Sequence, residues 1–142
     1  MAKRFHTIRF VEFSDTDMAG IVHFAAFFRY MESAEHELLR SVGLSVHNTW
    51  NGEAISFPRV AASCNFSSPA RCEDVLDIEV AIKRLGGKSV TYQFHVRNDG
   101  REVAHGEMTS VCCRVRPGEL IESIPIPDEI ADGLRQFVTE SQ

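Results

Sequence analysis

Long apolar runs are missing from this sequence. No uncharged apolar stretch approaches the roughly 18 residues that a helix needs to cross a bilayer. The N-terminal segment includes Lys3, Arg4 and Arg9, but no apolar stretch of the kind found in a secretory signal peptide follows them. We therefore expect a cytoplasmic protein that is not attached to a membrane.

An excess of positive charge is also missing. The 15 Lys and Arg residues are outnumbered by 20 Asp and Glu residues, which gives a formal net charge of -5. Proteins that bind nucleic acid or anionic lipid normally present a basic face to the phosphates. We therefore expect neither nucleic acid nor a membrane surface as a partner.

Cysteine and histidine spacings typical of metal sites are absent. The sequence has four cysteines but no C-x-x-C motif, and the adjacent Cys112 and Cys113 would point to opposite faces of a strand. The histidines other than His23 form no ligand spacing with acids or cysteines. We expect four reduced thiols, mostly in the core, and no bound metal or cofactor.

Two motifs of common enzyme classes are incomplete. Gly87-Lys88-Ser89 resembles the end of a phosphate-binding P-loop, but Ile82 occupies the position of the first glycine. Residues 43–46 begin like the Gly-x-Ser-x-Gly elbow of serine hydrolases, but His47 follows where the elbow needs glycine. The sequence therefore disfavours both a P-loop enzyme and a serine hydrolase.

The composition that is present is that of an ordinary globular protein. Of the 142 residues, 44% are apolar and 25% are charged. A chain of this length can bury a substantial core but leaves little room for a second one. We expect a single domain over residues 1–142.

One long helix and several strands are predicted from periodicity. Apolar residues recur every three or four positions from about residue 24 to 42, which predicts a helix that ends at Gly43. Alternating residues predict strands over 76–83 and 90–97, and a third strand over 102–116. Glycine-rich turns between these strands indicate hairpins, so the strands are antiparallel.

The remaining segments complete an α+β pattern. Residues 4–13 are rich in Phe, Ile, Val and Thr and predict a first strand, whereas 45–58 predict an irregular loop with one helical turn. Pro127 opens a short C-terminal helix with Ile130, Leu134 and Phe137 on one face. We therefore expect an antiparallel sheet that wraps around the long helix.

The densest group of reactive side chains lies just before this helix. Asp15, Asp17 and His23 fall in the connection between the first strand and the helix, and aromatic residues follow. A carboxylate beside apolar side chains is poorly solvated and becomes more basic. The helix start adds free N–H groups, which can stabilise an oxyanion. The pattern fits acyl transfer, but the two acids fit helix capping or a turn equally well.

A family resemblance decides between these two interpretations. The segment from Phe13 to Tyr30, with its Asp-x-Asp-x-x-Gly motif, resembles the 4-hydroxybenzoyl-CoA thioesterase family. The resemblance continues through Pro58, residues 64–66, residues 74–76 and residues 88–89, and so spans most of the chain. It implies the hotdog fold, in which an antiparallel sheet wraps around a long central helix.

The resemblance also implies the site residues. Asp17 matches the catalytic carboxylate, which acts as nucleophile or as general base, and Asp15 becomes a turn or cap residue. Many relatives carry a His four residues after the glycine, where this sequence has Phe24. We therefore interpret His23 as a pocket-lining residue, the backbone N–H near Phe24 as the oxyanion donor, and Phe27 as part of the acyl pocket.

The resemblance further implies how the substrate and the subunits are arranged. The turn with Arg84, Gly86, Gly87 and Lys88 is expected to meet the phosphates of coenzyme A, with Lys88 at a basic position of the family. Relatives build the site between two protomers, so a homodimer or homotetramer is expected. No cofactor is implied, since coenzyme A is part of the substrate.

The sequence thus predicts an acyl-CoA thioesterase that releases a free acid and CoA. Two alternatives stay open. A hotdog hydratase or dehydratase would use His23, the sole candidate histidine, together with an acid. A non-catalytic acyl-thioester binding module would keep the fold without turnover.

Overall fold

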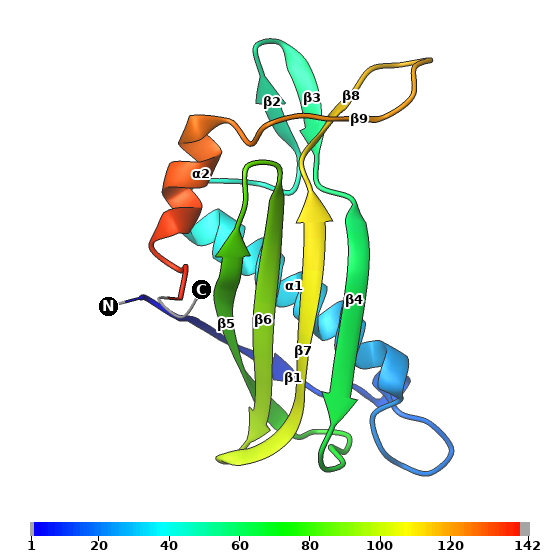
Figure 1. The fold of residues 1–142 in the computed structure, drawn as a ribbon. Coiled ribbons are helices and arrows are strands. Elements are labelled where there is room, and N and C mark those ends of the chain that lie inside the picture. Colours follow the sequence, from blue (N-terminus) through cyan, green and yellow to red (C-terminus); the bar gives the residue numbers. More distant parts are fainter. Residues whose placement is uncertain (1, 140–142) are drawn as a thin grey trace.

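A five-stranded antiparallel sheet lies against one long helix in the structure, a computed structural model that describes residues 2–139 (Figure 1). The large sheet has the strand order β1-β5-β6-β7-β4, and a smaller sheet of order β2-β3-β8-β9 extends from one end. The elements are, in chain order, β1 (Phe5–Phe10), η1 (Phe13–Asp15), α1 (Phe24–Ser41), β2 (Asn48–Trp50), β3 (Glu53–Ser56), β4 (Arg59–Phe66), β5 (Val75–Leu85), β6 (Ser89–Asn98), β7 (Arg101–Val111), β8 (Cys113–Val115), β9 (Glu122–Ser123) and α2 (Asp128–Arg135). This confirms the predicted α+β class.

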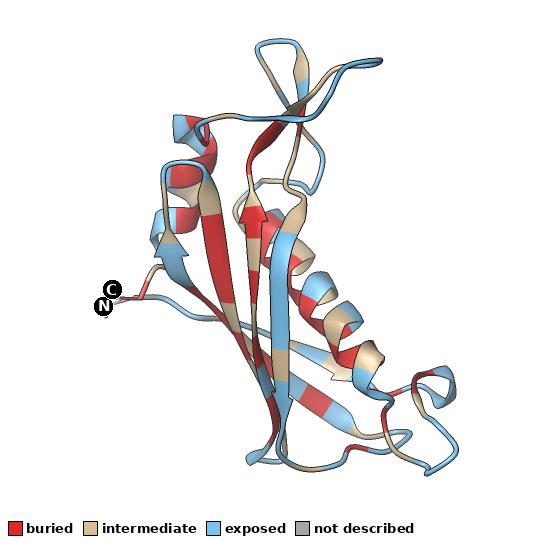
Figure 2. Cartoon of the chain, turned by 45° about the vertical axis from the view of Figure 1, so that its right-hand side comes forward, coloured by how far each residue is buried: buried red, intermediate tan, exposed pale blue. Residues whose placement is uncertain are grey.

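Helix α1 forms where the apolar period predicted it. Its 18 residues include no β-branched residue, glycine or proline, so nothing in its interior opposes the helical backbone. Gly43 ends it with φ +78°, and its N–H donates to the carbonyl of Arg40. The residues that α1 buries include Ala26, Tyr30 and Leu38. Figure 2 shows the buried parts of α1 on the side of the helix that faces the sheet.

The core lies between α1, α2 and the inner face of the sheet. Strands β5 and β6 alternate as predicted, so every second side chain is buried over most of their length. Helix α2 covers one end of this core with Ile130 and Leu134, and Phe137 follows just after the helix, all buried as expected. No helix among the described residues is long and apolar enough to span a membrane.

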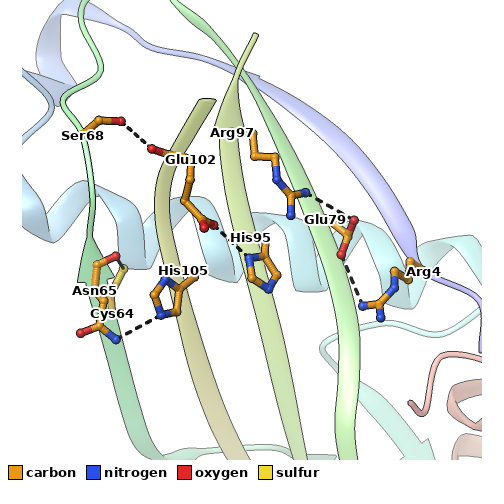
Figure 3. A network of polar contacts seen from close by, with 9 residues as sticks. All are labelled: Arg4, Cys64, Asn65, Ser68, Glu79, His95, Arg97, Glu102 and His105. Carbon is orange, nitrogen blue, oxygen red and sulfur yellow. Dashed lines mark hydrogen bonds and ion pairs between the residues drawn. The ribbon is translucent and has the colours of Figure 1, made fainter. Parts of the chain in front are cut away.

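Polar side chains cover the other face of the large sheet (Figure 3). Glu79, His95 and His105 each lie between two buried neighbours, and since side chains alternate along a strand, they point away from α1. They make hydrogen bonds or ion pairs with residues of neighbouring segments, namely Arg4, Asn65, Arg97 and Glu102. The sheet therefore has one apolar face, and that face packs on α1.

Gly106 in β7 allows the sheet and helix α1 to pack closely. A Cβ atom there would lie 2.5 Å from the carbonyl oxygen of Ser63 and 2.8 Å from the sulfur of Met31. Because the Ser63 backbone belongs to the β4–β7 ladder, Gly106→Ala is expected to lower the free energy of unfolding by about 1–3 kcal/mol. Urea unfolding measures this loss.

The matched control for this change is Gly87→Ala, where an added Cβ meets nothing within 4 Å. It should leave the unfolding free energy within about 0.5 kcal/mol of wild type. Equal stability of the two variants would mean that the close approach at Gly106 has no energetic consequence.

Two predicted segments were wrong. Residues 45–58 are not an irregular loop, since β2 and β3 form a hairpin there. Asn51 and Gly52, with φ 51° and 77°, make the two-residue turn that an Asn-Gly pair favours. The first strand ends at Phe10 rather than Phe13, because the chain leaves the β5 ladder and Phe13 enters the short helix η1.

The third predicted strand is divided in two. At Cys112 the chain leaves the large sheet, and β8 then pairs with β3 in the smaller sheet. This change of sheet buries both Cys112 and Cys113. Cys64 is half-buried and Cys72 is exposed, so the core position expected for most thiols holds for two of the four.

Candidate active site

A short ordered loop between β1 and α1 presents Asp17. The loop is closed by a bridge between Thr16 and Val22, and the Asp17 N–H donates to the carbonyl of Ile21 at 2.9 Å. Gly20 completes the turn with φ +78°, a backbone conformation that favours glycine. One carboxylate oxygen of Asp17 accepts the N–H of Ala19 at 2.9 Å, which orients the side chain.

Asp17 lies on the wall of a groove of about 470 Å³. The remaining walls are mostly apolar and come from the loop, the first turns of α1, the end of β4 and the segment that follows it. They are formed by Ile21, Val22, Phe24, Phe27, Phe66, Ser67, Ser68, Pro69 and Ala70. Two of the predicted substrate-binding residues, Phe24 and Phe27, thus share one groove with Asp17.

The first turn of α1 includes a backbone donor, the N–H of Phe24, that can serve a ligand. The His23 imidazole accepts the N–H of Ala25 through Nδ1 at 3.1 Å, and the His23 carbonyl accepts the N–H of Ala26 at 2.9 Å. The N–H of Phe24 has no acceptor within the described part of the chain. An unpaired N–H at a helix start is the kind of donor that an oxyanion needs.

His23 acts as the N-cap of α1, and it is not among the residues that line the groove. Its ring stacks on Phe24, with 4.6 Å between the centroids. The predicted pocket-lining role is therefore not found in the single chain. The imidazole nitrogen that caps the helix is occupied by that hydrogen bond, which limits what His23 can do in proton transfer.

Asp17 is exposed in the single chain, and Phe24 and Phe66 are 60% and 50% exposed. The poorly solvated setting that the sequence predicts for the carboxylate is thus not formed by one chain alone. Asp15 has the opposite environment, since it is 4% exposed and lies outside the groove wall. This agrees with its predicted role as a turn residue.

The predicted coenzyme A turn lies far from Asp17 within one chain. Phe10, just before the Asp17 loop, pairs with Val75 at the start of β5, whereas Arg84 and the turn residues Gly86–Lys88 lie at the end of that strand. Ten strand steps separate Val75 from Leu85, which corresponds to roughly 33 Å. Figure 1 shows the two loops at opposite ends of the sheet.

The groove also contains residues that sequence reasoning missed. Phe66 packs against Phe27 with 5.5 Å between ring centroids, and the Ala70 carbonyl accepts the N–H of Val22 at 2.8 Å. These contacts join residues 39 and 48 positions apart, so periodicity could not reveal them. The available signal was a Phe followed by Ser-Ser-Pro-Ala directly after a strand.

No group of three or more His, Cys, Asp or Glu side chains among residues 2–139 is arranged to hold a metal ion. The stacked pair of His95 and His105 on the outer face of the sheet is bonded to Glu102 and Asn65, respectively (Figure 3).

Comparison with solved structures identifies the fold. The chain superimposes on a 1,4-dihydroxy-2-naphthoyl-CoA thioesterase from Synechocystis with a TM-score of 0.82 and 24% identity, over 94% of this chain and 96% of that one. A gentisyl-coenzyme A thioesterase gives a TM-score of 0.76 and 28% identity over 93% and 99% of the two chains. The predicted hotdog fold is confirmed.

Comparison with known sequences identifies the superfamily. A 1,4-dihydroxy-2-naphthoyl-CoA hydrolase of Thermosynechococcus vestitus is 26% identical over 133 residues, which is 94% of this chain and 90% of the relative. The model of the thioesterase-like superfamily matches residues 11–134. The superfamily is therefore confirmed, whereas the narrower 4-hydroxybenzoyl-CoA family stays a prediction. The chain belongs to the thioesterase-like superfamily.

Proposed function

We propose that this protein hydrolyses an acyl-CoA thioester to a free acid and CoA, with Asp17 as the catalytic carboxylate. The observation that carries the proposal is that one groove is lined both by the Asp17 carboxylate and by Phe24, the residue whose helix N–H is unpaired. The chain belongs to the thioesterase-like superfamily, and its relatives include proteins named as CoA hydrolases and thioesterases. It is therefore a thioester hydrolase.

Each group has a defined part in the reaction. The Phe24 N–H donates to the thioester oxygen and stabilises the negative charge that develops on it. Asp17 either removes a proton from the attacking water or attacks the carbonyl carbon itself. In both routes the C–S bond breaks and CoA leaves as a thiolate, which needs little acid assistance. In the second route, water then hydrolyses the anhydride formed between the acyl group and Asp17, which releases the acid and restores the carboxylate. The apolar walls exclude water from the acyl group.

The acyl group is proposed to be aromatic. Phe24, Phe27 and Phe66 give the groove three aromatic rings, two of them largely exposed, and flat rings stack well on such surfaces. The relatives named as naphthoyl-CoA and gentisyl-CoA enzymes support this choice.

The coenzyme A turn enters this site only from a second chain. Arg84, Gly86, Gly87 and Lys88 cannot reach the Asp17 groove of their own chain, because the length of β5 lies between them. Strand β4 is an edge strand of the large sheet, so it can pair with a strand of a second chain. Its residues Val60 to Ser63 are exposed, and none of them is charged or a proline. If β4 of one chain paired antiparallel with β4 of a second chain, the Asp17 groove of one chain would lie at the same end of the dimer as the coenzyme A turn of the other.

We therefore predict a homodimer, or a homotetramer built from two such dimers. Light scattering after size exclusion at micromolar concentration should give at least twice the 15.9 kDa mass of one chain. A monomer that still hydrolyses its substrate would contradict the shared site.

The function is tested by thiol release from a panel of aryl- and alkyl-CoA thioesters. Release that is fastest with aryl thioesters supports the proposal. Hydration of an enoyl-CoA without thiol release would instead indicate a hydratase. Binding of acyl-CoA with neither reaction would indicate a binding module.

A further inference from the structure

Asp15 is a buried carboxylate that the proposed reaction does not use. Its side chain accepts the Glu12 N–H at 3.0 Å, the Tyr30 hydroxyl at 2.9 Å and the Arg29 guanidinium at 3.3 Å. Its backbone carbonyl accepts the N–H of His23, the N-cap residue of α1, at 2.9 Å. Asp15 therefore connects the beginning of the Asp17 loop to both the start and the body of the helix.

Tyr30 is the helix residue that holds Asp15 in place. It is fully buried, and its ring packs against that of Phe27 in a T-shaped arrangement with 5.6 Å between the centroids. The guanidinium of Arg9, from β1, lies 5.1 Å above the ring centre. Because Phe27 and Arg9 both pack against the ring, the position of its hydroxyl is fixed, and the hydroxyl points at Asp15.

The protonation states of this pair suit a permanent hydrogen bond. Burial, together with the Asp15 carboxylate, holds the pKa of Tyr30 far above its ordinary value. Burial also disfavours the charged form of Asp15, but the hydrogen bonds from Glu12, Tyr30 and Arg29 outweigh it and lower its pKa. At neutral pH the phenol therefore donates to a carboxylate.

From these contacts we propose that Tyr30 is a positioning residue of the active site. Its hydroxyl, acting through Asp15, fixes Asp17 relative to the free N–H of Phe24. Asp17 follows Asp15 by two residues, and Phe24 follows His23, whose N–H is bound by the backbone carbonyl of Asp15, so both reacting groups are anchored to the residue that Tyr30 holds in place. The inference rests on the function proposed above.

The consequence is measurable because catalysis depends on small distances. Misplacement by about 1 Å can lower a rate by as much as about 100-fold. Tyr30→Phe removes one oxygen atom and keeps the packed ring, and Asp15 retains its bonds from Glu12 and Arg29. We expect kcat for thiol release to fall about 10-fold, with KM within about twofold of wild type, since the groove wall is unchanged.

Tyr92→Phe is the matched control, since Tyr92 is the other tyrosine of the chain, equally buried, and lies on β6 away from the groove. It should leave kcat unchanged.

A double-mutant cycle then separates positioning from general destabilisation. In an Asp17→Asn background, Tyr30→Phe should have no further effect on kcat, because the group that it positions is already lost. A full 10-fold loss in that background, or wild-type kcat in Tyr30→Phe alone, would overturn the proposal.

Hydrogen exchange of the peptide that covers residues 13–24 tests the same contact without a substrate. Tyr30→Phe should speed exchange in this segment, whereas Tyr92→Phe should not. Faster exchange with no thiol release even by wild type would show that the hydroxyl anchors the loop while the proposed reaction is wrong. Unchanged exchange would contradict the anchoring itself.

Discussion

Replacement of Asp17 by Asn is expected to lower kcat for thiol release by about 100-fold or more, with a much smaller change in KM. The amide cannot take a proton from water or form an acyl intermediate, so either route is blocked. The remaining oxygen can still accept the Ala19 N–H, which keeps the loop intact. Steady-state kinetics on the best aryl-CoA of the panel measures the effect.

The control for this change is Asp77→Asn. Asp77 is also an exposed aspartate, but it lies on β5 outside the groove, so its loss should leave kcat within about twofold. Equal unfolding temperatures of the two variants would show that both fold normally. A fully active Asp17→Asn enzyme would remove Asp17 from the mechanism and reopen the hydratase and binding-module alternatives.

Local periodicity explains why much of the fold was predictable. Helix α1, strands β5 and β6, and the Asp99-Gly100 hairpin all arise from interactions within about twenty residues. The second sheet was missed because its strands are two to four residues long and its pairings, such as Ile55 with Arg114, join distant segments. Strands that short have too little alternation to be detected.

The site was predictable only where its residues are neighbours in sequence. Asp17, Phe24 and Phe27 lie within one loop and the first turns of a helix, and the structure places them at one groove. Phe66 was missed because it meets Phe27 through the tertiary fold. The coenzyme A turn is separated from Asp17 by the whole sheet, a distance that only strand pairing reveals.

The second large effect concerns stability, and it is expected at a buried ion pair away from the groove. Glu35 of α1 is 4% exposed and pairs with Arg59 of β4, which also donates to the Ser110 hydroxyl at 3.2 Å. Arg59→Met leaves the Glu35 carboxylate buried without its partner. The free energy of unfolding at pH 8 should therefore fall by about 1–2 kcal/mol, as measured by urea unfolding.

The pH dependence identifies the cause of that loss. Burial raises the pKa of Glu35 from 4.5 to about 7, although Arg59 opposes the rise. A carboxyl whose pKa is higher in the folded state stabilises the protein fully below its unfolded value, and this contribution disappears as pH rises through the folded value. Without Arg59 the pKa rises further, so at pH 5 Glu35 is neutral in the variant and the loss should be much smaller.

A double variant provides the decisive comparison. Glu35→Gln in the Arg59→Met background removes the buried charge, so at pH 8 it should recover most of the lost stability and abolish its pH dependence. Equal losses at pH 5 and pH 8 would mean that Arg59 stabilises the fold by packing rather than by charge. Because Glu35 lies eleven residues after Phe24, about 16 Å along α1, kcat at pH 6 should hardly change in the double variant. Stability and catalysis are then separable, with the ion pair in the second half of α1 and the reacting groups at the start of the helix and in the loop before it.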